Sequence, residues 1–178
     1  LRDITEKNKI REQLKNLATI DSLSGVFNRN RFLELAEEEK IKSRNLGYPI
    51  CFLMMDIDRF KAINDKWGHG AGDSIIREFG NLMKQTFTNG ITGRVGGEEF
   101  AVILPNCDIE EGKKQAEKFR FCIENMEVEH EDTVIKTTVS IGVACSDKTG
   151  TEIEELMRRA DKGMYHAKYT GRNKVEIN

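Results

Sequence analysis

The chain has 178 residues and a formal net charge of −2. That length suits one domain with a core of ordinary size and a short extension. The near-neutral charge excludes a basic surface for a nucleic-acid polymer, and no apolar run approaches the roughly 20 residues that cross a bilayer.

The first segment predicts a short helix in front of the main domain. Residues 1–5 resemble the end of a strand, and residues 6–18 then show helical spacing. The apolar side chains that recur four and three apart are Ile10, Leu14 and Leu17. This a/d seam covers barely two heptads, so a short coiled coil and a helix packed on its own domain are both open.

The domain boundaries follow from this pattern. The sequence begins with Leu1 rather than methionine, which predicts a piece of a longer protein. We assign residues 1–20 to a helix and linker that follow an upstream domain, and residues 21–178 to a domain of their own.

The middle of the chain alternates between strand and helix patterns. Residues 50–55 are almost continuously apolar, as expected for a strand buried on both faces. Asp73 is expected to cap a helix with the apolar stripe Ile75, Ile76, Phe79, Leu82 and Met83. Residues 91–95 and 100–104 are expected to form a hairpin across Gly96 and Gly97.

The last third continues the alternation. Asp108 is expected to cap a helix, with Glu111 as its capping-box partner. Residues 135–143 alternate between apolar and polar, which predicts a half-buried antiparallel strand. Thr151 is expected to cap a final helix that ends at Gly171. We predict an α/β sandwich with a mostly antiparallel sheet flanked by helices.

The cysteines indicate a reducing setting. Cys51, Cys107, Cys122 and Cys145 are far apart and form no Cys-x-x-Cys pair, which argues against a zinc site or a disulfide framework. We expect reduced, structural thiols in a cytoplasmic protein.

Carboxylates follow two apolar strands and suggest a metal site. Asp56 and Asp58 come after the run at 50–55, and Glu98 and Glu99 follow the glycine turn. With the carbonyl of Ile57, these oxygens suit one or two Mg²⁺ ions, with Mn²⁺ as the alternative, held against a triphosphate. For Asp58, simple solvation at the strand end is an equal alternative.

Basic residues near these carboxylates suit phosphate. Lys61 follows the strand end, where it is expected to reach phosphate as a catalytic residue, and Lys168 and Arg172 stand four apart near the end of the last helix. An interaction with the helix dipole, worth about 0.3–1 kcal/mol, is the alternative for the last two.

The motifs together resemble the GGDEF family of diguanylate cyclases, in its Gly-Gly-Glu-Glu-Phe variant. The resemblance spans residues 21–178 and rests on four segments: Asp21-x-Leu-x-Gly-x-x-Asn-Arg29, residues 56–73, the turn at Gly96 to Phe100, and Lys168-x-x-x-Arg172. It implies a palm-like, ferredoxin-related fold. It also implies that two GTP molecules condense into cyclic di-GMP and two pyrophosphates across a homodimer.

The resemblance also implies how the base is recognised and which residue takes the proton. Asp73 accepts the N1–H and N2–H of guanine, the Asn64 amide addresses the other polar edge, and His69 lines the same pocket. A plain helix cap is the alternative for Asp73, and the two roles are compatible. Glu98 is expected both to bind metal and to accept the proton of the 3′-hydroxyl.

The run from Arg2 to Glu6 resembles the exit of a PAS sensor domain. The two resemblances imply that residues 1–20 are a signalling helix and linker from an upstream sensor domain and that residues 21–178 are the catalytic domain. One departure from the family stands out. The inhibitory Arg-x-x-Asp is expected at 87–90, but the sequence there is Phe87-Thr-Asn-Gly90.

Two other functions stay open. A degenerate domain would hold GTP or an effector and signal through the helix at 6–18, but no metal ligand of the family is lost. A cyclase of relaxed purine specificity is associated with loss of the aspartate at the Asp73 position, and that aspartate is present.

Overall fold

The centre of the fold is β2 (Ile50–Ile57), a strand whose eight residues are all buried. The computed structural model describes residues 2–147 and 150–178. β2 lies inside a six-stranded sheet in which β1–β3 and β7–β8 pair in parallel and the other neighbours are antiparallel. The strand order is β1 (Phe27–Asn28), β3 (Ile91–Arg94), β4 (Glu99–Pro105), β2, β7 (Val139–Cys145) and β8 (Val175–Ile177).

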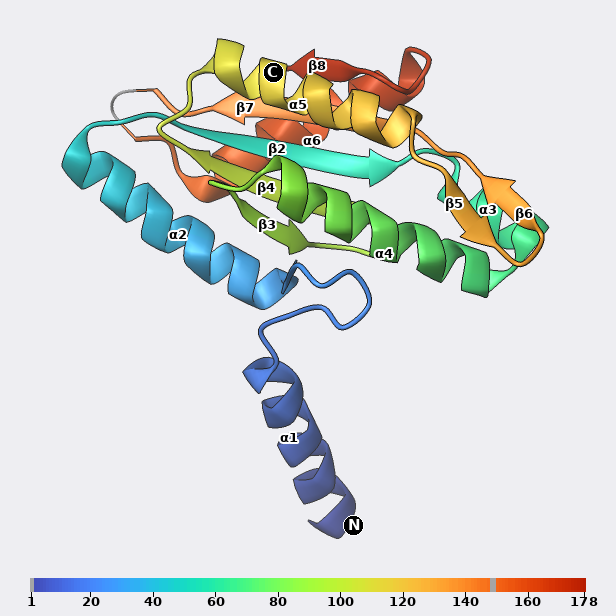
Figure 1. The fold of residues 1–178 in the computed structure, drawn as a ribbon. Helices are drawn as coiled ribbons and strands as arrows, with labels where there is room; N and C mark the ends of the chain where they lie inside the picture. Colours follow the sequence, from blue (N-terminus) through green and yellow to red (C-terminus); the bar gives the residue numbers. More distant parts are fainter. Residues whose placement is uncertain (1, 148–149) are drawn as a thin grey trace.

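Helices cover both faces of this sheet, which makes three layers (Figure 1). Leu53 and Met55 of β2 belong to the core under α4 (His69–Thr86) and α5 (Ile109–Glu124). Phe52 and Met54 belong to the core under α2 (Arg29–Leu46) and α6 (Ile153–Tyr169). The continuous apolar run of β2 therefore reflects burial on both faces, as predicted. The predicted fold class, a mostly antiparallel sheet flanked by helices, is confirmed.

A smaller unit lies at the end of the sheet where β2 ends. α3 (Phe60–Trp67) follows β2 and packs against α4. β5 (Val128–His130) and β6 (Thr133–Ile135) form a separate two-stranded sheet beside α3 and the start of α4 (Figure 1). The His130 ring lies against Gly70 of α4, where a Cβ atom would come within 3.2 Å of the ring.

Two of the three predicted helix caps are wrong. The Asp108 side chain accepts from Glu111 N at 2.9 Å, which confirms that cap. α4 begins at His69 with Gly68 as its cap, so Asp73 lies inside the helix and does not cap it. Glu152, not Thr151, is the cap residue of α6.

The strand predicted at 135–143 is also different in the structure. It is interrupted, because β6 ends at Ile135 and β7 begins at Val139. β7 is not half-buried either, since Ser140 and Gly142 are as buried as the apolar positions between them. α5 and α6 both contact β7, so both of its faces are covered.

The expectation of four reduced thiols is wrong for one pair. Cys51 and Cys145 form a disulfide between β2 and β7, and Cys107 and Cys122 are free. The two paired residues are direct partners in the strand register, with Cα atoms 4.0 Å apart. A separation of 94 residues hides this proximity in the sequence.

α1 (Arg2–Leu17) projects away from the three layers (Figure 1). It is helical from Arg2, so the strand end expected at residues 1–5 is wrong for residues 2–5, and residue 1 lies outside the described residues. Ile10 and Leu14 are exposed, and the side chain of Leu17 lies outside the described residues. In the described ranges, no helix combines the length and apolar character that a membrane crossing needs.

Candidate active site

Asp56 marks the end of β2 at which the acidic side chains gather. The strand continues through Ile57, so Asp56 is still paired, with Glu99 of β4 on one side and Ser140 of β7 on the other. The side chain of Asp56 is 6% exposed. β2 therefore runs two residues beyond the predicted strand at 50–55, and Asp56 is the second-to-last residue of the strand.

The glycine turn brings Glu98 beside the same strand end. Ile57 N donates to Glu98 O at 3.2 Å, and Glu99 is the register partner of Asp56. The expected proximity of the turn to the end of β2 is thus present in the structure. Glu98 and Glu99 are both partly exposed.

Charged residues from distant segments hold this turn. Arg94 donates to Gly97 O at 2.9 and 2.7 Å and forms an ion pair with Asp21 at 3.1 Å. Arg29 donates to Val95 O at 2.8 Å. Sequence reasoning did not assign these supporting roles. The signal was present, because Asp21 and Arg29 begin and end the first of the four motif segments.

Lys168 of α6 reaches Asp56 directly. Its Nζ lies 2.7 Å from Asp56 Oδ1. Burial raises the pKa of Asp56 to about 6, against the ion pair with Lys168 and with help from the negative charges of Glu98 and Glu99. The negative charge of Asp56 is therefore only partly compensated by Lys168 in this buried position. A further cation bound to the carboxylate would stabilise its ionised form.

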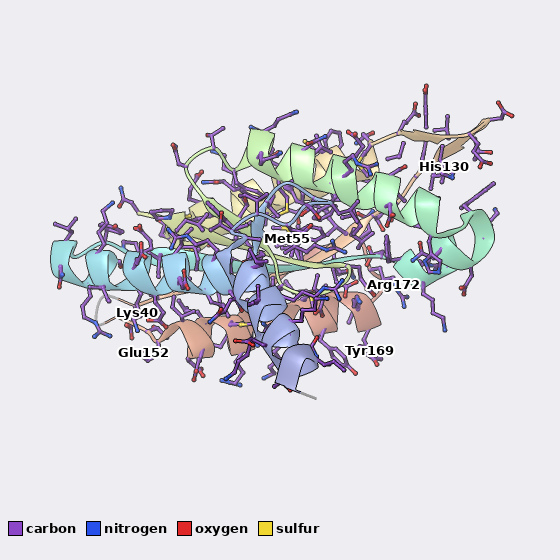
Figure 2. All side chains as sticks on the ribbon, turned by 90° about the horizontal axis from the view of Figure 1, so that it is seen from below. Lys40, Met55, His130, Glu152, Tyr169 and Arg172 are labelled. Carbon is purple, nitrogen blue, oxygen red and sulfur yellow. A yellow bond between two sulfur atoms is a disulfide. The ribbon has the colours of Figure 1, made fainter. Side chains whose placement is uncertain are left out.

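Asp56 and Lys168 share a groove of about 550 Å³ with the side chains of Glu99, Arg172, Tyr165 and Tyr169. The groove lies along the C-terminal end of α6. Figure 2 shows Tyr169 and Arg172 at this end of the molecule, far from the Lys40–Glu152 pair that joins α2 to the start of α6. Carboxylates and cations predicted to act together thus meet in one place.

The donor set fits a hard divalent cation, although the site is not a preformed cage. Within residues 2–147 and 150–178, no three His, Cys, Asp or Glu side chains are close enough to hold a metal ion together. The Lys168 ammonium supplies the positive charge next to Asp56 instead. Buried Asp56 with two nearby glutamates is nevertheless the oxygen-rich, negatively charged setting that Mg²⁺ requires.

The candidate base-recognition residues lie on α3 and α4. Oδ1 of Asn64 is buried and has no hydrogen-bond partner among the described residues. Gly72 makes room for it, because a Cβ atom at Gly72 would clash with Oδ1. Asp73 and His69 are exposed on the first turns of α4. Asn64 therefore offers a free acceptor next to the helix that carries Asp73.

Lys61 lies on the first turn of α3 and is exposed. It does not line the groove of Asp56 and Lys168. The structure thus brings Lys168 and Arg172 to the carboxylates but leaves Lys61 on a separate element.

Asp58 is neither solvated nor directed at the carboxylate cluster. It is buried, and its carboxylate accepts from Ser140 Oγ at 2.7 Å, Thr138 Oγ1 at 2.6 Å and the backbone N of Asn173 at 3.0 Å. Both oxygens are in use, so the solvated alternative is wrong and the hydrogen bonds give Asp58 a structural role.

The raised pKa of Asp56 predicts a gain of stability when the charge is removed. An acid with a folded pKa near 6 and an ordinary value of 3.8 favours folding when protonated, so stability falls as pH rises from about 4 to 6. We expect Asp56→Asn to be about 2 kcal/mol more stable than the wild type at pH 7.5 and about equal near pH 4. Urea unfolding with EDTA present measures this. A less stable variant at pH 7.5 would mean that the Lys168 ion pair outweighs burial.

The chain is similar in sequence to a known protein family and to several of its members. The family model for the diguanylate cyclase GGDEF domain matches residues 18–174. Diguanylate cyclase DgcM of Escherichia coli (strain K12) is 34% identical over 175 residues, which cover 97% of this chain and 42% of DgcM. The response regulator PleD of Caulobacter vibrioides is 38% identical over 163 residues, which cover 89% of this chain and 36% of PleD.

A solved structure shows the same arrangement. The coiled coil and GGDEF domain of DgcB from Caulobacter crescentus, in complex with c-di-GMP, superimposes with a TM-score of 0.85 at 29% identity. The match covers 99% of this chain and 96% of that one. Against the curated relatives the chain is short, since it spans 36% to 48% of the length of the first three.

Proposed function

We propose, because this chain belongs to the family of diguanylate cyclase GGDEF domains, that it condenses two GTP molecules into cyclic di-GMP and two pyrophosphates. The observation that supports this best is the meeting of Asp56, Glu99, Lys168 and Arg172 in one groove, with Glu98 beside it. Carboxylates and cations in that arrangement suit transfer at a phosphate.

The residues divide into three roles. Asp56, Glu98, Glu99 and the carbonyl of Ile57 would hold Mg²⁺ or Mn²⁺, which when bound neutralises the phosphates and helps to activate the attacking hydroxyl. Lys168 and Arg172 bind the β and γ phosphates, and Lys61 approaches from α3. Glu98 accepts the proton of the 3′-hydroxyl, because a partly exposed carboxylate can pass that proton to water.

Guanine is recognised between α3 and α4. Asp73 accepts the N1–H and N2–H of the base, and the Asn64 amide meets its other edge, with His69 at the border of the pocket. The absence of a helix cap role for Asp73 supports this, since its exposed carboxylate makes no hydrogen bond or ion pair within residues 2–147 and 150–178.

The domain organisation is part of the proposal. Residues 1–20 carry signals from an upstream sensor of PAS type, and residues 21–178 form the catalytic domain in the cytoplasm. Each domain holds one GTP, so the 3′-hydroxyl of one nucleotide meets the α-phosphate of the other across a homodimer.

Stoichiometry tests the reaction. With GTP and Mg²⁺ we expect one pyrophosphate for each GTP consumed and no inorganic phosphate, because bond breaking occurs at the α-phosphate. Coupled assays specific for pyrophosphate and for phosphate measure both. Phosphate and GDP as the products would show a GTPase. GTP binding with no release of either would support the binding-module alternative.

We expect activity per mole of chain to rise with protein concentration. α1 has only 16 residues and exposes Ile10 and Leu14 without a partner in the described part of the chain, too little to hold a stable dimer in water. A leucine zipper fused upstream in register with Ile10 should raise the activity of dilute protein.

The matched control carries two extra residues at the junction, which rotate the zipper by about 200° around the helix axis. We expect it to dimerise with lower activity. Specific activity that is constant over a broad dilution series, with a monomer in light scattering, would contradict the dimer requirement.

We expect no tight product inhibition. Phe87, at the position of the family's inhibitory arginine, is buried and packs on Phe119 with ring centroids 5.1 Å apart. Arg94 nearby is already engaged by Asp21 and Gly97. Micromolar cyclic di-GMP added to initial-rate assays should therefore compete only weakly with GTP. Strong inhibition that saturating GTP cannot relieve would reveal a second product site.

A further inference from the structure

The loop that follows α6 contains an unusual pair of backbone conformations. Arg172 has a φ of 63° and Asn173 a φ of 48°, both in the left-handed region. Asparagine tolerates this region well, whereas arginine rarely adopts it. Such a conformation persists only where the surroundings hold it, and it occurs often at functional sites.

The side chain of Arg172 has no hydrogen bond or ion pair within residues 2–147 and 150–178, and it lines the groove that contains Asp56. Its backbone is the tethered part, because Arg172 N donates to Ala167 O at 2.9 Å. The position of the Arg172 guanidinium in the groove therefore depends on the conformation of its main chain. Contacts that hold the main chain of this loop also determine where the positive charge lies.

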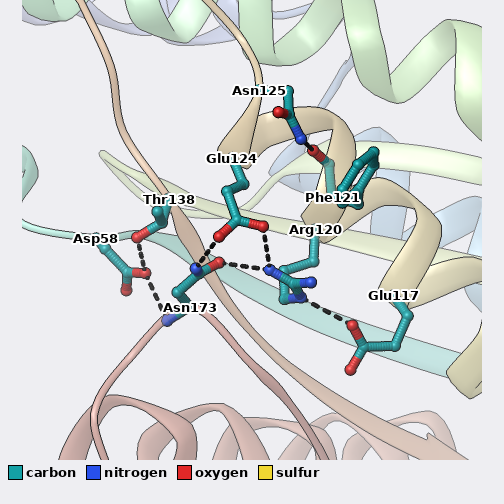
Figure 3. Close-up of polar contacts among 8 residues, drawn as sticks. All are labelled: Asp58, Glu117, Arg120, Phe121, Glu124, Asn125, Thr138 and Asn173. Atoms are coloured by element: carbon teal, nitrogen blue, oxygen red, sulfur yellow. Dashed lines mark hydrogen bonds and ion pairs between the residues drawn. The ribbon is translucent and has the colours of Figure 1, made fainter.

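Asn173 is fixed at three points, which Figure 3 shows. Its backbone N donates to Asp58 Oδ2 at 3.0 Å. Its side-chain oxygen accepts from Arg120 Nη1 at 2.8 Å, and its Nδ2 donates to Glu124 Oε1 at 2.8 Å. Both ends of the amide are therefore used and both reach α5, whereas the backbone N reaches Asp58 at the end of β2.

These partners are themselves anchored. Asp58 is held by Thr138 and Ser140 of the β7 region, as described above. Arg120 also bonds Glu117 and Glu124, each about one turn away on α5. We call Asp58, Arg120, Glu124 and Asn173 the Asn173 clamp. It joins the loop after α6 to the end of β2 and to α5.

We propose that the Asn173 clamp positions Arg172 for the β and γ phosphates of GTP. The inference rests on the proposed function. Lys168 ties one end of the segment to Asp56, and Asn173 ties the other end to Asp58, two residues further along the chain. The carboxylate cluster and the phosphate-binding arginine thus share one support, and Asn173 acts through Arg172 without touching the nucleotide.

The test compares two ligands at equilibrium. The first is a GTP analogue with a methylene group between the α and β phosphorus atoms, which cannot be turned over, and the second is GMP, which lacks the β and γ phosphates. Asn173→Gly keeps access to the left-handed backbone but removes the amide. We expect it to weaken the analogue about tenfold and to leave GMP unchanged.

A double-mutant cycle separates positioning from general loosening. In an Arg172→Ala background, Asn173→Gly should cause no further loss of analogue affinity, because the residue through which it acts is gone. Arg120→Lys removes the guanidinium group that donates to the Asn173 side chain. This variant provides a second test of the clamp should the glycine variant fold poorly. We expect it to weaken the analogue about threefold.

Asn125→Ala is the matched control, since its amide lies at the same end of α5 but bonds only Phe121 O among the contacts drawn in Figure 3. It should bind both ligands like the wild type. The proposed role of the Asn173 clamp would be overturned by either of two results. One is a loss of analogue affinity in Asn173→Gly that adds to the loss caused by Arg172→Ala, and the other is an equal loss of GMP affinity. A wild-type chain that fails to bind the analogue would instead overturn the proposed function, and the inference with it.

Discussion

Glu98→Gln should lower cyclic di-GMP formation at least a hundredfold while the protein stays folded. The substitution keeps the shape of the side chain but removes the negative charge and the ability to accept a proton. General base catalysis alone contributes roughly 10² to 10⁴ in rate, and loss of a metal oxygen adds to this. Initial rates with saturating GTP and Mg²⁺ measure the effect.

The backbone contact at this position should survive the change. Ile57 N bonds the main-chain oxygen of Glu98, and the side chain is not needed for it. Thermal melting of the variant should therefore match the wild type. Glu110→Gln, at an exposed glutamate in the first turn of α5, is the control and should be fully active. More than a few per cent of wild-type activity in Glu98→Gln would assign the catalytic role to another residue.

GTP should be preferred over ATP by roughly 10⁴ in kcat/KM, because a site that pairs buried polar groups with its ligand rejects an analogue that leaves them unpaired. Asn64 Oδ1 is such a group, and it has no partner within the described residues. Guanine offers two donors to Asp73, whereas adenine presents an acceptor at N1. Competing turnover of the two nucleotides in one reaction measures the ratio.

Asp73→Ser should reduce that preference by tenfold or more, mainly through slower use of GTP. Gln85→Ser, at an exposed position further along the same helix, serves as the control and should keep the wild-type ratio. Equal use of ATP and GTP by the unmutated protein would contradict the guanine assignment.

The sequence predicted those parts of the fold that depend on local pattern. The apolar run of β2, the hairpin across Gly96 and Gly97, and the Asp108 cap all appear in the structure. α2 went unnoticed because only Phe32, Ala36 and Ser43 are buried along it, so its apolar stripe is thin. β7 looked half-buried because Ser140 and Gly142 are small or polar. In the structure α6 lies so close that a Cβ atom at Gly142 would clash with its backbone, and Ser140 donates to the buried Asp58.

For the candidate site, too, the sequence predicted the residues that belong to motifs but not the contacts that support them. Motif residues led to Asp56, Glu98, Glu99, Lys168 and Arg172, and the structure brings them to one end of β2. The contacts that support them could not be read from the sequence, even though Asp21 belongs to a motif segment, because Asp21 reaches Arg94 across 73 positions and Asp58 reaches Asn173 across 115. Such contacts depend on strand register and helix packing rather than on any local pattern. The same reason hid the pairing of Cys51 with Cys145.

The nature of the product tests the central claim most directly. The chain should be incubated with GTP and Mg²⁺ at high protein concentration, and the nucleotides separated and identified by mass spectrometry, with Glu98→Gln run in parallel. We expect a single new species with the mass and retention of cyclic di-GMP, absent from the Glu98→Gln reaction. Unchanged GTP, or GDP as the sole product of the wild-type chain, would contradict the proposal that this domain is a diguanylate cyclase.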